Sequence, residues 1–250
     1  MKYLSVLVTL IFMLAVFAPN TYAKSTLSPL KSTSSPFDHP ISPNSEASKL
    51  PKEFAPTHYP DVNQYIIQNQ IKHSKVVKDS RMNTLPKLPY KYGTYQGIVI
   101  HEVGEDNSTL TQWVDRMYET YETAFVHAFV DNNEIHLTAP AEYYVWGAGK
   151  EANPYFYQIE VVRTYTFDDF AKSVNNQAWL AAYMLKQKNL TPTLADDNEG
   201  IGTIISHNAV GKYWGGTDHT DPIAYYAKWG YDMHQFFDLV NYHYNHMDAV

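Results

Sequence analysis

The chain has 250 residues, of which 44% are hydrophobic and 18% are charged, so it can fill one core of ordinary size and is not broadly disordered. Its formal net charge of −7 argues against a nucleic-acid partner, because such binding depends on lysine and arginine against phosphates. The sequence contains no cysteine, which excludes disulfide bonds and a catalytic thiol.

The first residues have the plan of a secretory signal. Lys2 precedes an apolar run over residues 4–18, and Ala23 offers the small residue that signal peptidase needs. An uncleaved membrane anchor, the alternative, requires a longer apolar stretch of about 20 residues. We therefore expect residues 1–23 to be a signal peptide that is removed, which leaves an exported protein with no membrane segment.

Residues 24–55 have the composition of a flexible spacer. Serine and proline are frequent in this stretch, and such a composition cannot bury enough apolar surface to fold. The composition changes at about residue 56, so one folded domain is expected over residues 56–250.

Within this domain, the spacing of apolar residues predicts alternating helices and strands. The expected helices cover residues 62–71, 109–121, 168–188 and 231–247, and Ser108 or Thr109 is expected to cap the second of them. The expected strands cover residues 97–101, 125–130, 135–138, 156–163 and 202–206. A lysine-rich connection and a turn region separate the first helix from the first strand, and residues 131–133 tolerate the positive φ of a tight hairpin. This pattern implies an α/β fold in which a mixed central β-sheet is flanked by helices.

Two of the eleven histidines end predicted strands. His101 follows the apolar run 98–100, and His207 follows residues 203–206. The strand ends of α/β folds hold functional side chains rigidly while the loops around them stay open. Either histidine alone would still be interpreted as a structural residue with satisfied hydrogen bonds.

The loop sequence over residues 214–222, WGGTDHTDP, changes that interpretation. Its glycines permit a tight loop, and His219 and Asp221 stand two positions apart, free to face one centre. Two imidazoles and one carboxylate form a common catalytic zinc set, whose fourth position takes water. Asp218 is a competing carboxylate, and the spacing does not choose between it and Asp221.

Several separated motifs carry a more specific signal. They are residues 97–101 (GIVIH), 106–109 (DNST), 124–131 (AFVHAFVD), 138–140 (TAP), 146–147 (WG), 153–154 (NP), 206–207 (SH) and 215–222 (GGTDHTDP), together with Glu160. In this order they resemble the type-2 N-acetylmuramoyl-L-alanine amidases, especially the amidase domains of staphylococcal-type autolysins. The resemblance reaches back to about residue 56, and it implies the fold shared by type-2 amidases and peptidoglycan recognition proteins.

The resemblance also implies roles for individual residues. It aligns His101, His207 and Asp221 with the ligands of one catalytic Zn²⁺, and so selects Asp221 over Asp218. It aligns Glu160 with the catalytic glutamate of the family, and His219 with a position beside the zinc. Without the resemblance, an ion pair with Arg163 would be an equally good interpretation of Glu160.

Other positions give weaker signals. Trp146 and His127 are candidates for substrate binding, since a flat ring stacks on a sugar or a peptide, although packing explains both as well. Val103 stands where the family often has a small hydroxyl residue, so a substrate hydrogen bond is expected to be missing there. Glu102 is expected to point to the opposite face of its strand from His101, and so not to bind the metal.

A second metal site on the final helix is not expected. His243 and His246 lie one turn apart there, but no carboxylate or cysteine partner is evident in the sequence.

The function implied by the resemblance is hydrolysis of the amide between N-acetylmuramic acid and the L-alanine of the peptidoglycan stem peptide. Such a protein would be a secreted zinc amidase of the extracellular space or cell wall, with peptidoglycan as its partner and a monomer as the default state. The alternative is a non-catalytic peptidoglycan-binding module of the same fold, which usually lacks a zinc ligand. A zinc peptidase acting on proteins has no support, because the sequence contains no His-Glu-x-x-His helix.

Overall fold

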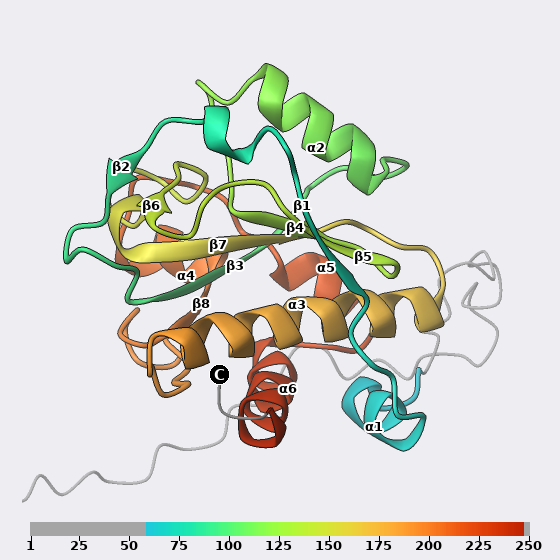
Figure 1. Cartoon of the computed structure of the whole chain (residues 1–250). Helices are drawn as coiled ribbons and strands as arrows, with labels where there is room; N and C mark the ends of the chain where they lie inside the picture. The colour runs from blue at the N-terminus through green and yellow to red at the C-terminus, as the bar shows by residue number, and fades with distance from the viewer. Residues whose placement is uncertain (1–58, 248–250) are drawn as a thin grey trace, which may run out of the picture. The chain divides into compact units, whose positions relative to one another are not determined.

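A mixed sheet of six strands forms the centre of the domain in the computed structural model (Figure 1). In the order in which they pair, the strands are β1 (Lys75–Lys78), β5 (Glu134–Leu137), β4 (Ala128–Val130), β7 (Phe156–Val161), β3 (Gly97–Glu102) and β8 (Ile204–Ser206). Only β5 and β4 are antiparallel, and the other neighbours in this sheet are parallel. The expected mixed sheet is therefore confirmed.

The structure describes residues 59–247. The predicted signal peptide and spacer, residues 1–23 and 24–55, lie outside the described residues. The described helices are α1 (Val62–Gln68), α2 (Leu110–Glu119), α3 (Phe167–Gln187), α4 (His207–Tyr213), α5 (Ile223–Ala227) and α6 (Met233–His246), and a second small sheet pairs β2 (Leu88–Pro89) with β6 (Tyr143–Tyr144). Among these helices, none is both long and apolar enough to cross a membrane.

Helices cover both faces of the sheet, and α2 lies on the opposite side from α3 (Figure 1). All six residues of β3 are buried, as expected of a central strand in a parallel arrangement. Alternate residues of β3 enter different cores: Ile98 and Ile100 pack with α3, whereas Val99 packs with α4. The buried face of α3 is the predicted amphipathic face, and it includes Phe170, Val174, Ala178, Ala181 and Leu185.

A separate core lies under α2. Leu110, Val114 and Met117 of this helix pack with Phe125 and Phe129 rather than with the residues that contact α3. We call this group the α2 core. Thr109 caps the helix, because its hydroxyl accepts a hydrogen bond from Gln112 N at 3.3 Å, and the Gln112 side chain accepts one from Thr109 N at 2.8 Å.

Some local predictions need correction. The lysine-rich connection contains β1, and a helix not predicted from the sequence, α4, begins directly at His207. The hairpin between β4 and β5 uses no positive φ at residues 131–133. Instead the Asp131 carboxylate accepts hydrogen bonds from Asn133 N and Glu134 N, at 2.8 and 2.9 Å, which closes the turn without that backbone conformation.

The parallel arrangement brings three carboxyl-terminal strand ends together. β7, β3 and β8 are adjacent, and they end at Val161, Glu102 and Ser206. In open α/β sheets this edge is where functional groups gather, because the loops that follow parallel strands all leave from it.

The α2 cap gives a test of local stability. We expect Thr109→Ala to lower the free energy of unfolding by about 1 kcal/mol, since a helix N–H loses its acceptor. The exposed control Glu119→Ala should change it by less than about 0.5 kcal/mol. Urea denaturation at unchanged m-value would measure both, and an equal effect of the two variants would contradict the role of the cap.

Candidate metal centre

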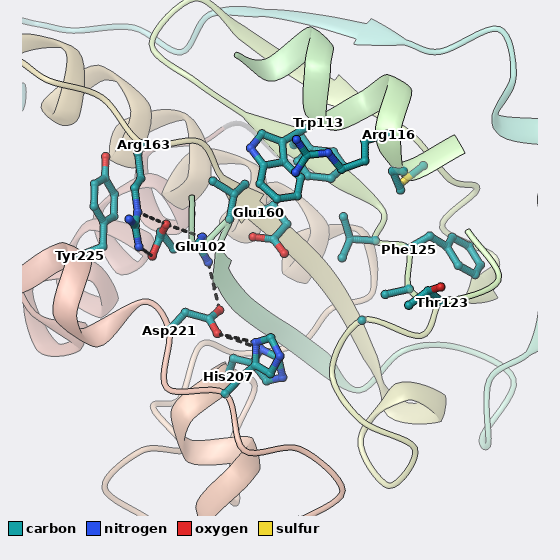
Figure 2. A pocket seen from close by; sticks show the side chains of 18 of the residues that line it. Glu102, Trp113, Arg116, Thr123, Phe125, Glu160, Arg163, His207, Asp221 and Tyr225 are labelled. Carbon is teal, nitrogen blue, oxygen red and sulfur yellow. Dashed lines mark hydrogen bonds and ion pairs between the residues drawn. The ribbon is translucent and has the colours of Figure 1, made fainter. Parts of the chain in front are cut away.

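The side chains of His101, His207 and Asp221 converge at the strand edge, and their donor atoms nearly touch. Figure 2 shows two of them, His207 and Asp221. His101 Nδ1 lies 3.0 Å from His207 Nδ1 and 3.4 Å from Asp221 Oδ2, and His207 Nδ1 lies 3.1 Å from Asp221 Oδ1. Ligands about 2.0–2.1 Å from a tetrahedral ion are roughly 3.3 Å apart. The cluster therefore has the size needed to hold one small divalent cation. We call it the metal cluster.

Each member of the metal cluster is placed by a different element. His101 is the fifth residue of β3 and the register partner of Glu160 on β7, so both side chains leave the same face of the sheet. His207 opens α4, whose N-cap is Ser206 at the end of β8. Asp221 precedes α5, and its backbone carbonyl accepts a hydrogen bond from Asn208 N at 3.0 Å.

Burial and hydrogen bonding give His101 and Asp221 the protonation states that a cation requires. Burial, with a smaller contribution from His207, lowers the pKa of His101 to about 4, so its imidazole is neutral at pH 7. Burial alone would raise the pKa of Asp221, but hydrogen bonds with His101 and His207 outweigh it and hold that pKa well below its usual range. Neutral imidazole and ionised carboxylate are the forms that bind metal.

The two histidines differ in how their second ring nitrogen is held. His207 Nε2 lies 3.1 Å from the Thr217 hydroxyl, which fixes the ring orientation. His101 Nε2 is buried and has no hydrogen-bond partner within residues 59–247. Thr217 was not identified from the sequence, and its signal there is weak, since it is one of two threonines in the loop that carries Asp221.

Glu160 faces the metal cluster as a carboxylate without a counter-ion. Its Oε2 is buried and has no hydrogen-bond partner among the described residues. Arg163 instead pairs with Glu102, at 2.5 Å between Nε and Oε1, and with Asp106 at 3.2 Å. The alternative interpretation of Glu160, an ion pair with Arg163, is therefore wrong. Burial, and then the charges of Asp221 and Glu102, raises the pKa of Glu160 well above its usual value.

Glu160, His207 and Asp221 line one cavity of about 580 Å³. His207, His219 and Asp221 form one wall of the cavity, and Glu160 also faces it (Figure 2). The facing wall comes from α2 and the α2 core and is largely apolar, with Trp113, Met117, Phe125, Val126 and Phe129, although Arg116 also lines it. A substrate in this cavity would contact polar groups on one side and an apolar surface on the other.

The two aspartates of the loop over residues 214–222 have different positions in the structure. Asp221 joins the metal cluster, whereas Asp218 is exposed and lines the cavity without joining it. His219 stacks on the His207 ring at 4.7 Å between centroids, and its Nδ1 lies 3.5 Å from Asp221 Oδ1. Its ring is mostly exposed and borders the cavity, so it can reach a bound molecule.

The two candidates for substrate binding do not line this cavity. His127 is fully buried in the core, where its ring nitrogens contact the Tyr90 hydroxyl and Tyr143 O on one side and Gln158 N on the other. Trp146 packs edge-on against Phe125 at 4.4 Å, and its Nε1 donates to Tyr121 O. Both residues are therefore packing residues, which was the alternative interpretation. The alternation of residues along a strand predicts which face of the sheet a side chain lies on, but not what covers that face.

Three weaker predictions can also be placed. Val103 lines the cavity with an apolar side chain. Glu102 does not join the metal cluster, although it borders the same cavity while bound to Arg163. His243 Nε2 lies 2.8 Å from Asn175 Oδ1, and within residues 59–247 the metal cluster is the one group of three or more side chains placed to hold a metal ion.

The sequence of the chain matches known proteins along most of its length. The family model described as N-acetylmuramoyl-L-alanine amidase matches residues 91–224. Protein Ami of Listeria monocytogenes serotype 1/2a is 47% identical over 208 residues, which are 82% of this chain and 22% of that protein. A bifunctional autolysin of Staphylococcus aureus strain MRSA252 is 39% identical over 225 residues, which are 88% of this chain and 17% of that protein. The chain thus spans about a fifth of the length of these relatives.

A solved structure supports the same relationship. The crystal structure of the Staphylococcus aureus hydrolase AmiA in complex with its ligand superposes with a TM-score of 0.71 at 40% sequence identity. The match covers 76% of this chain and 93% of that chain. The fold of the described domain is therefore that of AmiA.

The two aspartates of the loop provide a test of the metal cluster. We expect Asp221→Asn to weaken Zn²⁺ binding roughly 100-fold or more, because the change removes a charged donor from the cluster itself. Asp218→Asn, the matched control, should bind Zn²⁺ within about twofold of the unmodified protein. Competition with a chromophoric chelator would measure both affinities, and an equal loss in the two variants would show that Asp221 is not a ligand.

Proposed function

The chain belongs to the N-acetylmuramoyl-L-alanine amidase family, and from this we propose that it hydrolyses the amide that joins N-acetylmuramic acid to the L-alanine of the peptidoglycan stem peptide. One Zn²⁺, held by His101, His207 and Asp221, is part of this proposal. The observation that carries it is the placement of an unpaired carboxylate, Glu160, in the same cavity as a three-donor metal cluster.

The donor set fits zinc on chemical grounds. Two imidazole nitrogens and one carboxylate oxygen are common ligands of catalytic zinc, and they leave a fourth position open to the cavity. A zinc ion held there supplies Lewis acidity towards a carbonyl oxygen and lowers the pKa of a bound water towards about 7. Thr217 and Asn208 support the proposal indirectly, because they hold His207 and the Asp221 backbone in place.

Glu160 is suited to move the proton in this reaction. Burial raises the pKa of its carboxyl group, and a higher pKa makes the carboxylate a stronger base towards the proton of water. In the proposed mechanism Glu160 takes a proton from the attacking water and delivers it to the leaving nitrogen of L-alanine. The Arg163–Glu102 pair supports this role, since it leaves Glu160 free of a competing counter-ion.

His219 is suited to stabilise the charge that develops on the carbonyl oxygen. It borders the cavity from the side of the metal cluster, stacked on His207. A hydrogen bond from its ring to the developing oxyanion would be worth about 3 kcal/mol of transition-state stabilisation.

The relatives suggest where the reaction takes place. One is named an autolysin, and we propose a corresponding role in cell-wall degradation, with the protein acting outside the cell. We also propose that residues 1–23 are a cleaved signal peptide, residues 24–55 a spacer and residues 56–250 the amidase domain. The mature protein would act on peptidoglycan as a monomer.

Replacing the carboxylate tests the assignment of Glu160. We expect Glu160→Gln to lower kcat roughly 100- to 10,000-fold, because the amide cannot accept the proton of water. Zinc content should stay near one ion per chain. Glu151→Gln, which changes an exposed carboxylate, serves as the control and should keep full activity. Undiminished turnover in Glu160→Gln would remove Glu160 from the mechanism.

Removing the metal tests the reaction itself. Incubated with insoluble cell walls, the protein should release new alanine amino termini, and a chelator should abolish the release until Zn²⁺ is restored. Amino-terminal labelling and a reducing-sugar assay would be run on the same digests. New reducing ends would indicate cleavage of the glycan instead, and binding without release would indicate a recognition module.

A further inference from the structure

Three consecutive amide side chains are fully buried in the middle of α3: Asn175, Asn176 and Gln177. A helix face packed on a sheet normally carries apolar residues, so buried amides there need partners of their own. Asn175 and Asn176 bond to parts of the chain remote from the cavity, namely Ile71, His243, Ser74 and Asp131. Gln177 alone among the three is directed at the strands beneath the metal cluster.

Gln177 uses its whole amide group in three hydrogen bonds. Its Nε2 donates to the backbone carbonyls of His101 and Ile159, both at 3.0 Å. Its Oε1 accepts a hydrogen bond from the Tyr226 hydroxyl at 2.7 Å. The orientation of the amide follows from its partners, because two carbonyl oxygens can only accept and must therefore meet the NH₂ group.

The three partners belong to the segments that carry the proposed site. His101 is itself a member of the metal cluster, and Ile159 immediately precedes Glu160 on the neighbouring strand β7. Tyr226 lies in α5, the helix that follows Asp221. Neither Gln177 nor Tyr226 has exposed surface, so solvent water is not at hand to replace these bonds.

His101 has particular need of such support. A metal-binding histidine is usually oriented through its second ring nitrogen, as Thr217 orients His207. His101 Nε2 has no such partner in the described part of the chain. Its side chain leaves the sheet on the face opposite α3, since Ile100 packs towards α3, and Gln177 therefore holds the His101 backbone from the far side.

We propose that Gln177 is a positioning residue that sets the relative placement of His101, Glu160 and Asp221. It acts through the backbone of β3 and β7 and through α5, and it does not line the cavity. Its loss should therefore weaken metal binding and lower kcat while KM changes little. This inference rests on the proposed zinc amidase function.

The neighbouring amide provides the matched control. Gln177→Met keeps the length of the side chain and removes all its hydrogen bonds. Asn176→Leu likewise removes the hydrogen bonds of a buried amide, but those bonds are to residues remote from the cavity. We expect Gln177→Met to lower Zn²⁺ affinity roughly tenfold and kcat to a similar extent, as loss of an outer-shell contact does. Asn176→Leu should lower Tm comparably and leave Zn²⁺ affinity, kcat and KM within about twofold. Equal Zn²⁺ affinities in the two variants would overturn the proposal.

Two further measurements keep the test decisive. Tyr226→Phe removes a single hydrogen bond from Gln177 and should give a smaller loss of Zn²⁺ affinity than Gln177→Met. An unchanged Zn²⁺ affinity in Tyr226→Phe would contradict the proposal. This variant keeps the test usable if Gln177→Met does not fold. Hydrogen exchange of the metal-free proteins should be faster at the ends of β3 and β7 in Gln177→Met, and at β1 and residues 131–134 in Asn176→Leu. Failure of the unmodified protein to bind Zn²⁺ would refute the proposed function, whereas unchanged exchange at β3 and β7 would refute the role of Gln177.

Discussion

The contact among His101, His207 and Asp221 is the constraint on which the rest of the site depends. Two imidazole nitrogens and the two oxygens of one carboxylate lie 3.0–3.4 Å from their neighbours in a largely buried space, although they come from a strand, a helix start and a loop. Burial favours the neutral imidazole of His101, and Asp221 remains ionised because the histidines face it. A cation held between them would satisfy all three groups, and hydrogen bonds from Gln177 and Asn208 hold the backbone carbonyls of His101 and Asp221.

The ion pair of Arg163 determines how the other charged residues lie around the metal cluster. Arg163 could in principle meet either Glu102 or Glu160, and it meets Glu102. The result is one neutralised carboxylate at the rim and one unpaired carboxylate facing the metal cluster. The paired Glu102 also contributes directly, because its backbone N–H donates to Asp221 Oδ2 at 3.1 Å. Glu102, the residue after His101, thus supports the metal cluster through its backbone and leaves Glu160 without a counter-ion among the described residues by pairing with Arg163.

Sequence patterns predicted those features that follow from periodicity, and they did not predict those that follow from contacts. The strand that contains His101, the strand directly before His207 and the helix after Thr109 follow from apolar spacing and a cap. Asp221 could be chosen over Asp218 only through family resemblance, because both lie in a loop with no period. The sequence left the environment of His127 open between the cavity and the core, and it did not identify Glu102 as the partner of Arg163, since alternation along a strand does not say what covers it.

The division of the hydrophobic residues into separate cores has a consequence for how such a protein can change. The apolar wall of the cavity belongs to the α2 core, whereas the segments that hold the metal cluster rest on the cores around α3 and α4. Substitutions in α2 can therefore reshape what the cavity accepts while the metal cluster keeps its geometry. Changes in what the cavity accepts and changes in the metal cluster can thus arise separately.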